Sequence, residues 1–229
     1  MLNFKQFKVL TFDCYGTLID WETGILQALK PILEVHNIYI DDENILELYA
    51  KFESQEESSG YKKYRQILQD VVKRFGEHFN FNPTETELHA LEESLKNWPP
   101  FNDTVSALQS LKKKYRLAVI SNIDRDLFAH SAEWLKVSFD WVITAEDVGD
   151  YKPSLKNFEF ALQKFRVDKS QVLHVAQSLF HDIAPAKKLG LTAVWVNRRK
   201  GKTGTGATPP AEIKPDLEVP DLQTLVRVI

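Results

Sequence analysis

Apolar residues follow two different periods along the chain, and the change between them divides the sequence into two kinds of segment. Near the start, the short apolar run of residues 9–12 has the length and composition of a buried strand. Between residues 21 and 96, apolar side chains instead recur every three or four positions, which is the period of a helix that buries one face. Three groups of positions carry this period: Ile25, Leu29, Ile32 and Leu33; Ile45, Leu48, Tyr49 and Phe52; and Tyr61, Tyr64, Leu68, Val71, Val72 and Phe75. We therefore expect several helices with no strand among them.

The far end of this helical segment is also marked in the sequence. Thr84 and Glu87 have the spacing of a capping box, which predicts the start of another helix after Pro83. Pro99 and Pro100 predict the end of the segment, because proline cannot continue a helix. A helical insertion of this length is more than a connection between two strands requires. It is expected to fold as a cap over the rest of the molecule.

From residue 103 onward, short apolar runs alternate with helical segments. Strands are predicted at 117–120, 141–143, 172–176, 193–196 and 217–219, and helices at 104–114, 124–135, 155–165 and 182–189. Together with the first strand, this alternation indicates a parallel sheet with helices on both faces. We predict an α/β fold in which residues 1–18 and 98–229 form a Rossmann-like parallel sheet core and residues 19–97 form an inserted α-helical cap subdomain. The segment 198–210, rich in Gly, Thr and Pro, lacks the spacing of a phosphate-binding loop and is predicted to be a flexible connection.

Composition and charge narrow the function classes. The chain has 229 residues, of which 43% are hydrophobic, as expected of a folded protein with a buried core. The net charge of −3 leaves no basic surplus for binding nucleic acid, no apolar run approaches membrane-spanning length, and the first residues lack the apolar region of a signal peptide. The single cysteine, Cys14, excludes an internal disulfide and fits a reducing compartment. We expect a cytoplasmic protein that binds neither nucleic acid nor membranes.

Polar side chains follow several of the predicted strands. In an open parallel sheet the carboxyl ends of the strands meet along one rim, where ligands bind. The residues at or just beyond these ends are Asp13, Ser121, Asn122, Lys152, Gln177, Ser178 and Asp182. Each has a simpler interpretation by itself, as a cap, a turn or a surface lysine. Their shared position favours an active site in which Asp13, poorly hydrated at the end of a buried strand, is the nucleophile.

These segments, in this order, resemble the four motifs of the haloacid dehalogenase superfamily, which are a nucleophilic Asp, a Ser or Thr, a Lys and an acidic cluster. The family positions are occupied by Asp13, Thr17, Ser121, Asn122, Lys152 and Asp182. With the cap, the resemblance covers nearly the whole chain. It implies a hydrolase that forms an ester between its aspartate and the substrate.

Two departures separate the chain from the phosphatases of that superfamily. Tyr15 stands where phosphatases carry a second Asp as general acid, and Gln177 stands where they carry an acid that binds magnesium. The resemblance therefore favours the L-2-haloacid dehalogenase branch, which shares the Asp-x-Tyr-Gly-Thr-Leu start and needs no metal or other cofactor. That branch typically holds the halide with an arginine early in the cap, whereas this chain has no arginine before Arg65, and it has Phe158 at a position where tyrosine is common. Segments 10–25, 121–125 and 178–182 also resemble S-azetidine-2-carboxylate hydrolase, which opens a strained C–N ring.

The resemblance implies a mechanism with a role for each residue. Asp13 attacks a saturated carbon next to a carboxylate, and water then cleaves the resulting ester at its acyl carbon. Lys152 is expected to hold the pKa of Asp13 down, and Asp182 to orient or deprotonate the water. The remaining expected contacts are Thr17 and Ser121 with Asp13 or the substrate carboxylate, Asn122 with the leaving group, and Tyr15, Trp21, Gln177 and Ser178 with the substrate.

The sequence leaves several alternatives open. The preferred interpretation is a hydrolase of small 2-substituted alkanoates, resembling 2-haloacid dehalogenases. The others are a C–N hydrolase of the azetidine-2-carboxylate type, a magnesium-dependent phosphatase, and a non-catalytic binding protein on the same fold. A thiol enzyme is disfavoured, because a lone Cys14 without an evident histidine partner is more often a small core residue. Neither the substrate nor the oligomeric state, a homodimer included, is decided by the sequence.

Overall fold

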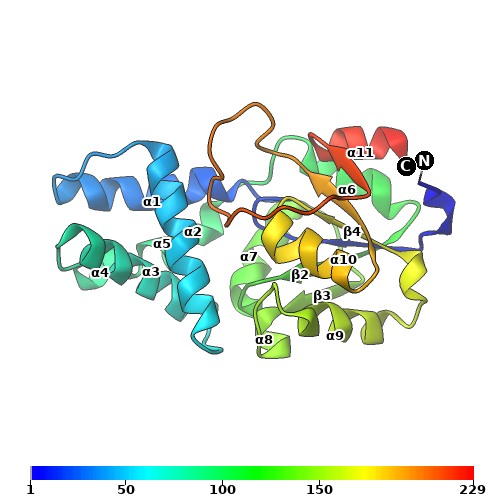
Figure 1. Ribbon diagram of the computed structural model, residues 1–229, viewed down its shortest axis with the longest axis horizontal. Helices are drawn as coiled ribbons and strands as arrows, with labels where there is room; N and C mark the ends of the chain where they lie inside the picture. The colour runs from blue at the N-terminus through cyan, green and yellow to red at the C-terminus, as the bar shows by residue number, and fades with distance from the viewer. Residues whose placement is uncertain (1) are drawn as a thin grey trace.

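The computed structural model describes residues 2–229 and contains a six-stranded sheet with a helical unit at one end of it (Figure 1). The strands are β1 (Val9–Phe12), β2 (Arg116–Ser121), β3 (Trp141–Thr144), β4 (Val172–Ala176), β5 (Thr192–Val196) and β6 (Leu217–Val219). Their order in the sheet is β3-β2-β1-β4-β5-β6, and every neighbouring pair is parallel. The predicted α/β fold is confirmed, including the edge strand at 217–219.

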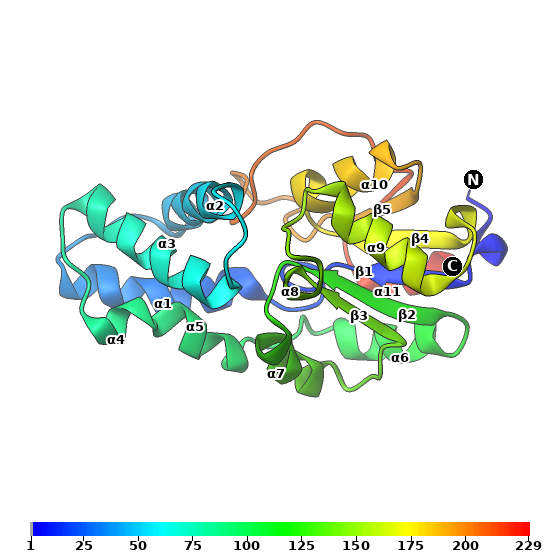
Figure 2. The same ribbon diagram turned by 90° about the horizontal axis from the view of Figure 1, so that it is seen from below.

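Helices cover both faces of the sheet because each strand buries residues on both sides. Leu10 and Phe12 of β1 belong to one hydrophobic cluster and Val9 to the other, as the alternation along a strand requires. On the first face lie α6 (Thr104–Lys112), α7 (Arg125–Leu135) and α11 (Leu222–Val228), and on the second face lie α9 (Leu155–Phe165) and α10 (Ala184–Lys188). Figure 2 shows these two layers on either side of the strands. A short helix, α8 (Ala145–Val148), follows β3, and 3-10 turns precede β1 (η1, Phe4–Gln6) and β4 (η3, Lys169–Gln171).

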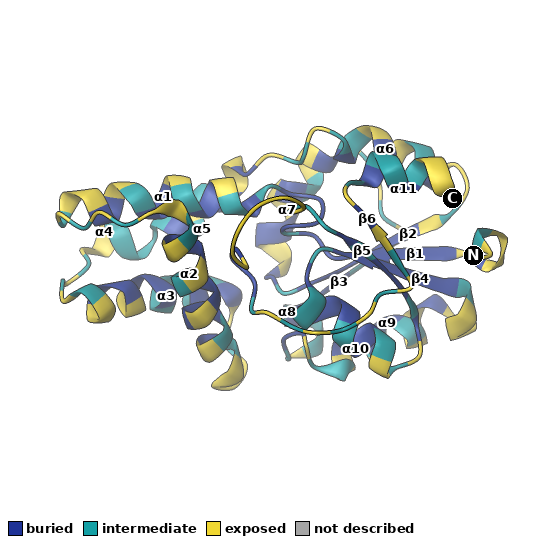
Figure 3. Ribbon diagram, turned by 45° about the horizontal axis from the view of Figure 1, so that its top comes forward, coloured by how far each residue is buried: buried dark blue, intermediate teal, exposed yellow. Residues whose placement is uncertain are grey.

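The cap is a set of helices inserted between β1 and α6. It consists of α1 (Trp21–Val35), α2 (Asp42–Ser58), α3 (Tyr64–Phe79), α4 (Glu85–Leu88), α5 (Ala90–Ser94) and the 3-10 turn η2 (Leu95–Asn97). The predicted capping box is present: the Thr84 N–H donates to the Glu87 carboxylate over 2.7 Å, and the Glu87 N–H donates to the Thr84 hydroxyl over 3.3 Å. Tyr61 departs from the predicted helical pattern, because it lies in the turn before α3 and is 41% exposed. Figure 3 shows buried strands and cap helices whose outer faces are exposed.

The predicted helix at 182–189 begins differently in the structure. Residues Leu179–Ile183 form a π-helical turn, η4, which leads directly into α10. The Ser178 hydroxyl accepts a hydrogen bond from the His181 N–H over 2.8 Å and so caps this turn. Asp182 is therefore inside a wide turn and not at a helix start. Single π-turns are frequent at functional sites.

The segment 198–210 is not the free connection that its composition suggests. Arg199 donates to Glu22 of α1 over 2.7 Å and also bonds to Glu43 of α2, and the Gly206 N–H donates to Glu43 over 2.8 Å. Thr208, near the end of the segment, is buried. Figure 1 shows this segment (orange) reaching from the sheet to the cap. The prediction that this segment is a flexible connection was wrong, because ion pairs with residues far away in the sequence hold it against the cap.

None of the helices within residues 2–229 has both the length and the apolar character needed to cross a membrane.

Candidate active site

The strands that carry the predicted nucleophile and its neighbours are adjacent in the sheet. β1 lies between β2 and β4, so Asp13, Ser121 and the start of η4 meet at one edge, where the strand order reverses. Lys152 enters from the loop after α8. Its ammonium donates to Asp13 Oδ1 over 2.9 Å, to Asp182 Oδ1 over 2.7 Å and to the Ile120 carbonyl over 2.9 Å. The structure thus brings Asp13, Lys152 and Asp182 into direct contact.

The carboxylate of Asp13 is held at both oxygens. Oδ1 accepts from Lys152, and Oδ2 accepts from the Thr17 hydroxyl over 2.7 Å. The Thr17 hydroxyl in turn accepts from the Gln177 N–H over 2.8 Å, which fixes its rotation. Burial raises the pKa of Asp13, while Lys152 and Thr17 act in the opposite direction. Lys152 lowers the pKa of Asp13 as expected, but the effect of desolvation is larger, so the pKa is raised overall. A poorly hydrated carboxylate is also the stronger nucleophile.

Asp182 is bound on one oxygen only. Its Oδ1 accepts from Lys152 and lies 3.0 Å from His174 Nε2, while His174 Nδ1 lies 2.8 Å from the Thr11 hydroxyl. Burial alone would raise the pKa of Asp182, but Lys152 and His174 together lower it. Asp182 Oδ2 is buried and has no hydrogen-bond partner among the described residues. It is an acceptor available to a water molecule or a substrate.

The turn after Asp13 depends on Gly16. Gly16 has φ +88°, a conformation that favours glycine, and its N–H donates to the Ile19 carbonyl over 2.9 Å. A Cβ at this position would lie 2.8 Å from Trp21 Nε1. The glycine therefore allows Trp21, the first residue of α1, to pack directly over the nucleophile loop.

A narrow cavity of about 30 Å³ lies between this rim and the cap. This is room for about two water molecules, since one water needs about 10–15 Å³ measured in this way. The cavity is lined by Asp13, Tyr15, Trp21, Glu53, Glu57, Tyr64, Ser121, Asn122, Lys152, Ser178, His181, Asp182 and Thr208. The cap is thus closed over the nucleophile, and a substrate of several atoms enters only when cap and core move apart.

A sequence model of the haloacid dehalogenase-like hydrolase family matches residues 10–196, which include the nucleophile, the cap and the lysine and acid of the rim. The chain belongs to the haloacid dehalogenase-like hydrolase family. This hydrolase is 30% identical over 210 residues to glyceraldehyde 3-phosphate phosphatase of Methanothermobacter thermautotrophicus, covering 83% of this chain and 85% of that protein. It is 26% identical over 231 residues to (S)-2-haloacid dehalogenase of Pseudomonas sp. (strain YL), covering 96% of this chain and 94% of that protein. The solved structure of L-2-haloacid dehalogenase from Xanthobacter autotrophicus is similar in fold, with a TM-score of 0.79 and 21% identity over 97% of this chain and 98% of that chain.

Thr17 takes one of the two parts expected of it, because its hydroxyl donates to Asp13 while the side chain is fully buried and does not line the cavity. Three of the predicted substrate-contact residues of this hydrolase play a different part from the one expected. The Gln177 side chain lies outside the cavity, where its Oε1 accepts from the Thr208 hydroxyl over 3.4 Å. The ring of Tyr15 lines the cavity, but its hydroxyl lies 2.7 Å from Ser131 Oγ. The structure therefore places Gln177 and the Tyr15 hydroxyl around the site instead of in contact with a substrate.

Asn122, the third, is occupied by protein partners. Its amide nitrogen donates to Glu57 Oε1 and to the Lys152 carbonyl, each over 3.0 Å, and its oxygen accepts from the Lys152 N–H over 2.7 Å. It positions Lys152, and solvation of a leaving group by Asn122 is not available in this arrangement. Ser121 differs, because its hydroxyl is buried on the cavity wall with no partner among residues 2–229. Ser121 is therefore available to donate a hydrogen bond to a substrate. Trp21 and Ser178 also line the cavity, where a substrate can contact them.

Several cavity residues were not anticipated from the sequence. Glu53 and Glu57 of α2 and Tyr64 of α3 form the cap side of the cavity, with Thr208 of the segment 198–210 beside them. Glu53 follows the predicted buried position Tyr49 by one helical turn, so an acid on the buried face of α2 was a signal available in the sequence. No comparable signal existed for Thr208, because its place depends on the docking of an irregular segment.

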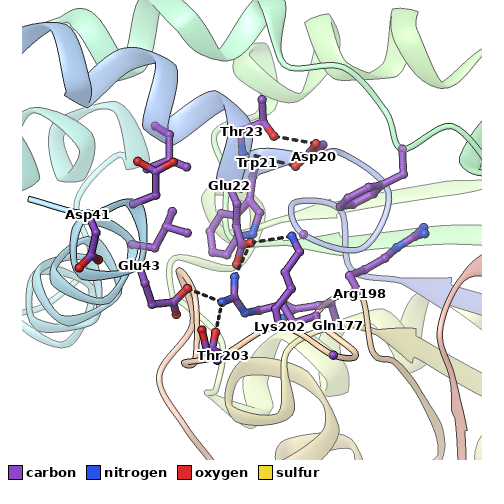
Figure 4. A pocket seen from close by; sticks show the side chains of 17 residues that line it. Asp20, Trp21, Glu22, Thr23, Asp41, Glu43, Gln177, Arg198, Lys202 and Thr203 are labelled. Carbon is purple, nitrogen blue, oxygen red and sulfur yellow. Dashed lines mark hydrogen bonds and ion pairs between the residues drawn. The ribbon is translucent and has the colours of Figure 1, made fainter.

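A larger groove of about 650 Å³ lies beside the active site, between the cap and the segment 198–210. Figure 4 shows Glu22 and Glu43 of the cap facing Lys202 and Thr203 across it. Trp21 lines both this groove and the cavity, whereas Asp13 lines only the cavity. The nucleophile identifies the smaller cavity, and not the larger groove, as the candidate active site.

The residues at the rim offer a poor cradle for magnesium, which prefers several oxygen ligands in octahedral geometry. Tyr15 and Gln177 supply no carboxylate, and Asp13 and Asp182 are both engaged by Lys152. In the part of the chain that is described, no group of three or more His, Cys, Asp or Glu side chains has an arrangement that suits a metal ion. The metal independence expected from the sequence stays a prediction, which the chelation experiment of the Discussion tests.

Proposed function

We propose that this hydrolase displaces a leaving group from the saturated carbon next to the carboxylate of a small 2-substituted alkanoate, in the manner of 2-haloacid dehalogenases. The observation that carries the proposal is the buried Asp13 carboxylate, held by Lys152 and Thr17 and facing a cavity closed by the cap. Members of the haloacid dehalogenase-like family with this activity include (S)-2-haloacid dehalogenase of Pseudomonas sp. (strain YL). A solved structure of L-2-haloacid dehalogenase from Xanthobacter autotrophicus contains covalently bound chloropropionic acid.

The reaction has two steps. In the first, an Asp13 oxygen forms a bond to C2 of the substrate, and the leaving group departs with the electron pair of its bond to C2. In the second, water attacks the acyl carbon of the ester, which releases a 2-hydroxy acid and regenerates Asp13. Dividing one difficult displacement into two steps is the advantage of covalent catalysis. The closed cap keeps bulk water away during the first step.

Three residues assist Asp13. Lys152 keeps the carboxylate aimed and balances its charge, and Thr17 fixes its second oxygen. Asp182 Oδ2 is a free acceptor on the cavity wall, suited to orient the water of the second step. General-base assistance of this kind contributes about 10²–10⁴-fold. The unpartnered Ser121 hydroxyl is available to the substrate carboxylate.

Phosphate ester hydrolysis is the second candidate, because one relative at 30% identity is a phosphatase. A phosphatase of this family needs a proton donor for its leaving alcohol near the nucleophile. Tyr15 occupies that position, and burial raises its pKa well above the ordinary value, so it is a weak acid whose hydroxyl lies against Ser131. The dehalogenase-like reaction requires no such donor, because a halide leaves without a proton.

A single turnover in ¹⁸O-water tests the covalent route. We expect the first label to appear in the peptide containing Asp13, because the oxygen that enters the product comes from its carboxylate. Label found first in the 2-hydroxy acid would mean direct attack by water and would refute the ester. Parallel assays with 2-chloropropionate, a phosphate ester and azetidine-2-carboxylate separate the proposed reaction from its alternatives.

We further propose a cytoplasmic location, supported by Cys14, the single cysteine, which is a buried free thiol. A homodimer stays a prediction that light scattering of the purified protein would test.

A further inference from the structure

The cap side of the active-site cavity is acidic. Glu53 and Glu57 lie one helical turn apart on α2, and both line the cavity whose opposite wall carries Asp13 and Asp182. Lys152 is the one lysine or arginine among the lining residues. His181 does not add a positive charge at neutral pH, because burial lowers its pKa to about 4.

Lys152 has no N–H group left for a further anion. Its three N–H groups are directed to Asp13, Asp182 and the Ile120 carbonyl. Arg65 does not line the cavity; it is engaged with Glu92 and Asp126. An anionic group on the cap side would therefore face carboxyl groups without a cation to hold it.

The cavity has acceptors that lack donors. Asp182 is 1% exposed and lines this cavity, and its Oδ2 has no hydrogen-bond partner among residues 2–229. Glu57 Oε2 lies 3.7 Å from His181 Nε2, which is too long for a hydrogen bond. Buried acceptors of this kind are stabilised by a ligand that supplies N–H donors and positive charge.

We infer that the substrate carries a protonated amine, and that Glu53 and Glu57 bind this ammonium on the cap side while the substrate carboxylate lies toward Ser121. The inference rests on the proposed function and names its substrate class: small 2-substituted carboxylic acids that also bear an ammonium group. The two glutamates are specificity residues in this assignment, since they contact the part of the substrate that does not react.

The protonation of the two glutamates supports the assignment. Burial raises the pKa of Glu53 to about 7 and raises the pKa of Glu57 well above its ordinary value. A bound ammonium favours the ionised carboxylates, so binding releases protons and tightens as pH rises through 7. The groups that face this pair are Tyr49 of α2, Tyr64 of α3, and Asp13, Asn122, Lys152, His181 and Asp182 of the core.

If the glutamates stay protonated, they would instead donate hydrogen bonds to an anionic ligand. Replacing a glutamate by glutamine distinguishes the two kinds of binding. Glutamine still donates to an anion but cannot balance an ammonium, so Glu57→Gln distinguishes them.

Calorimetric binding to the full chain tests the inference with two matched 2-hydroxy acids, isoserine (3-amino-2-hydroxypropionate) and lactate. They differ only by the ammonium group. We expect isoserine to bind at least about tenfold more tightly at pH 7.5, with proton release visible in buffers of different ionisation enthalpy. Glu57→Gln should remove the preference for isoserine. Glu47→Gln, at an exposed position of the same helix, should leave both affinities unchanged.

Equal binding of the two acids, no isoserine binding at millimolar concentration, or a preference that survives in Glu57→Gln would refute the inference. If Glu57→Gln fails to fold by circular dichroism, Glu53→Gln and the pH dependence of the wild type provide the same test. Turnover of 3-amino-2-chloropropionate and 2-chloropropionate separates the two proposals. Absence of turnover with a clear isoserine preference would refute the proposed reaction but not the ammonium site. Turnover of both chloro acids at equal kcat/KM would refute the ammonium site but not the proposed reaction.

Discussion

A buried carboxyl group in the cap should make the stability of this hydrolase decrease as pH rises. Glu53 is 3% exposed, and burial raises its pKa from an ordinary value of 4.5 to about 7. The folded chain therefore binds this proton more tightly than the unfolded chain. Its contribution to stability is complete below pH 4.5 and is lost as pH rises through 7. Glu53→Gln removes the titrating group and keeps an oxygen that accepts from Tyr49 and Tyr64.

The size of the effect follows from the two pKa values. The gap between 4.5 and about 7, at about 1.4 kcal/mol for each pH unit, amounts to about 3 kcal/mol over the full range. Between pH 5 and pH 8 the wild type should lose about 2 to 3 kcal/mol relative to Glu53→Gln. Other titrating groups cancel in this difference, apart from those coupled to Glu53.

Urea denaturation of both proteins at several values between these pH limits measures the difference directly. Glu47→Gln, at an exposed position of α2, is the matched control and should show no pH-dependent difference from wild type. A Glu53→Gln difference that is constant across this range would show that the Glu53 side chain titrates as an ordinary glutamate. It would also remove the protonation argument from the ammonium site.

Three further predictions concern the rim and its turn. Lys152→Met leaves two buried carboxylates without their cation and should reduce the free energy of unfolding by about 3–5 kcal/mol with loss of turnover, so near-native stability in denaturation would contradict the geometry described. Gly16→Ala places a Cβ against Trp21 at a positive φ and should cost about 1–3 kcal/mol, whereas an unchanged Tm would show that the turn relaxes freely. Incubation with a chelator should leave turnover unchanged. Loss of activity that magnesium restores would favour phosphate ester hydrolysis over the proposed reaction.

Much of the fold was predictable because its signals are local. Each strand is a short apolar run bounded by polar turns, and parallel strands bring their carboxyl ends to one rim whatever the details of packing. This reasoning placed Asp13, Ser121, Lys152 and Asp182 at one edge of the sheet before any contact was known. The helical period likewise identified the cap, apart from Tyr61, which lies outside α3.

The sequence by itself thus determined the α/β topology, the helical insertion and the polar residues of the rim. Only the tertiary structure decided which cap residues lie opposite the polar residues of the rim. The helical period places Glu53 and Glu57 near one face of α2, but the docking of the cap decides that this face meets Asp13. The segment 198–210 is held by Arg199 against Glu22 and Glu43, partners more than a hundred positions away. Burial, which sums over the whole fold, decides that the pKa of Asp13 rises although Lys152 contacts it.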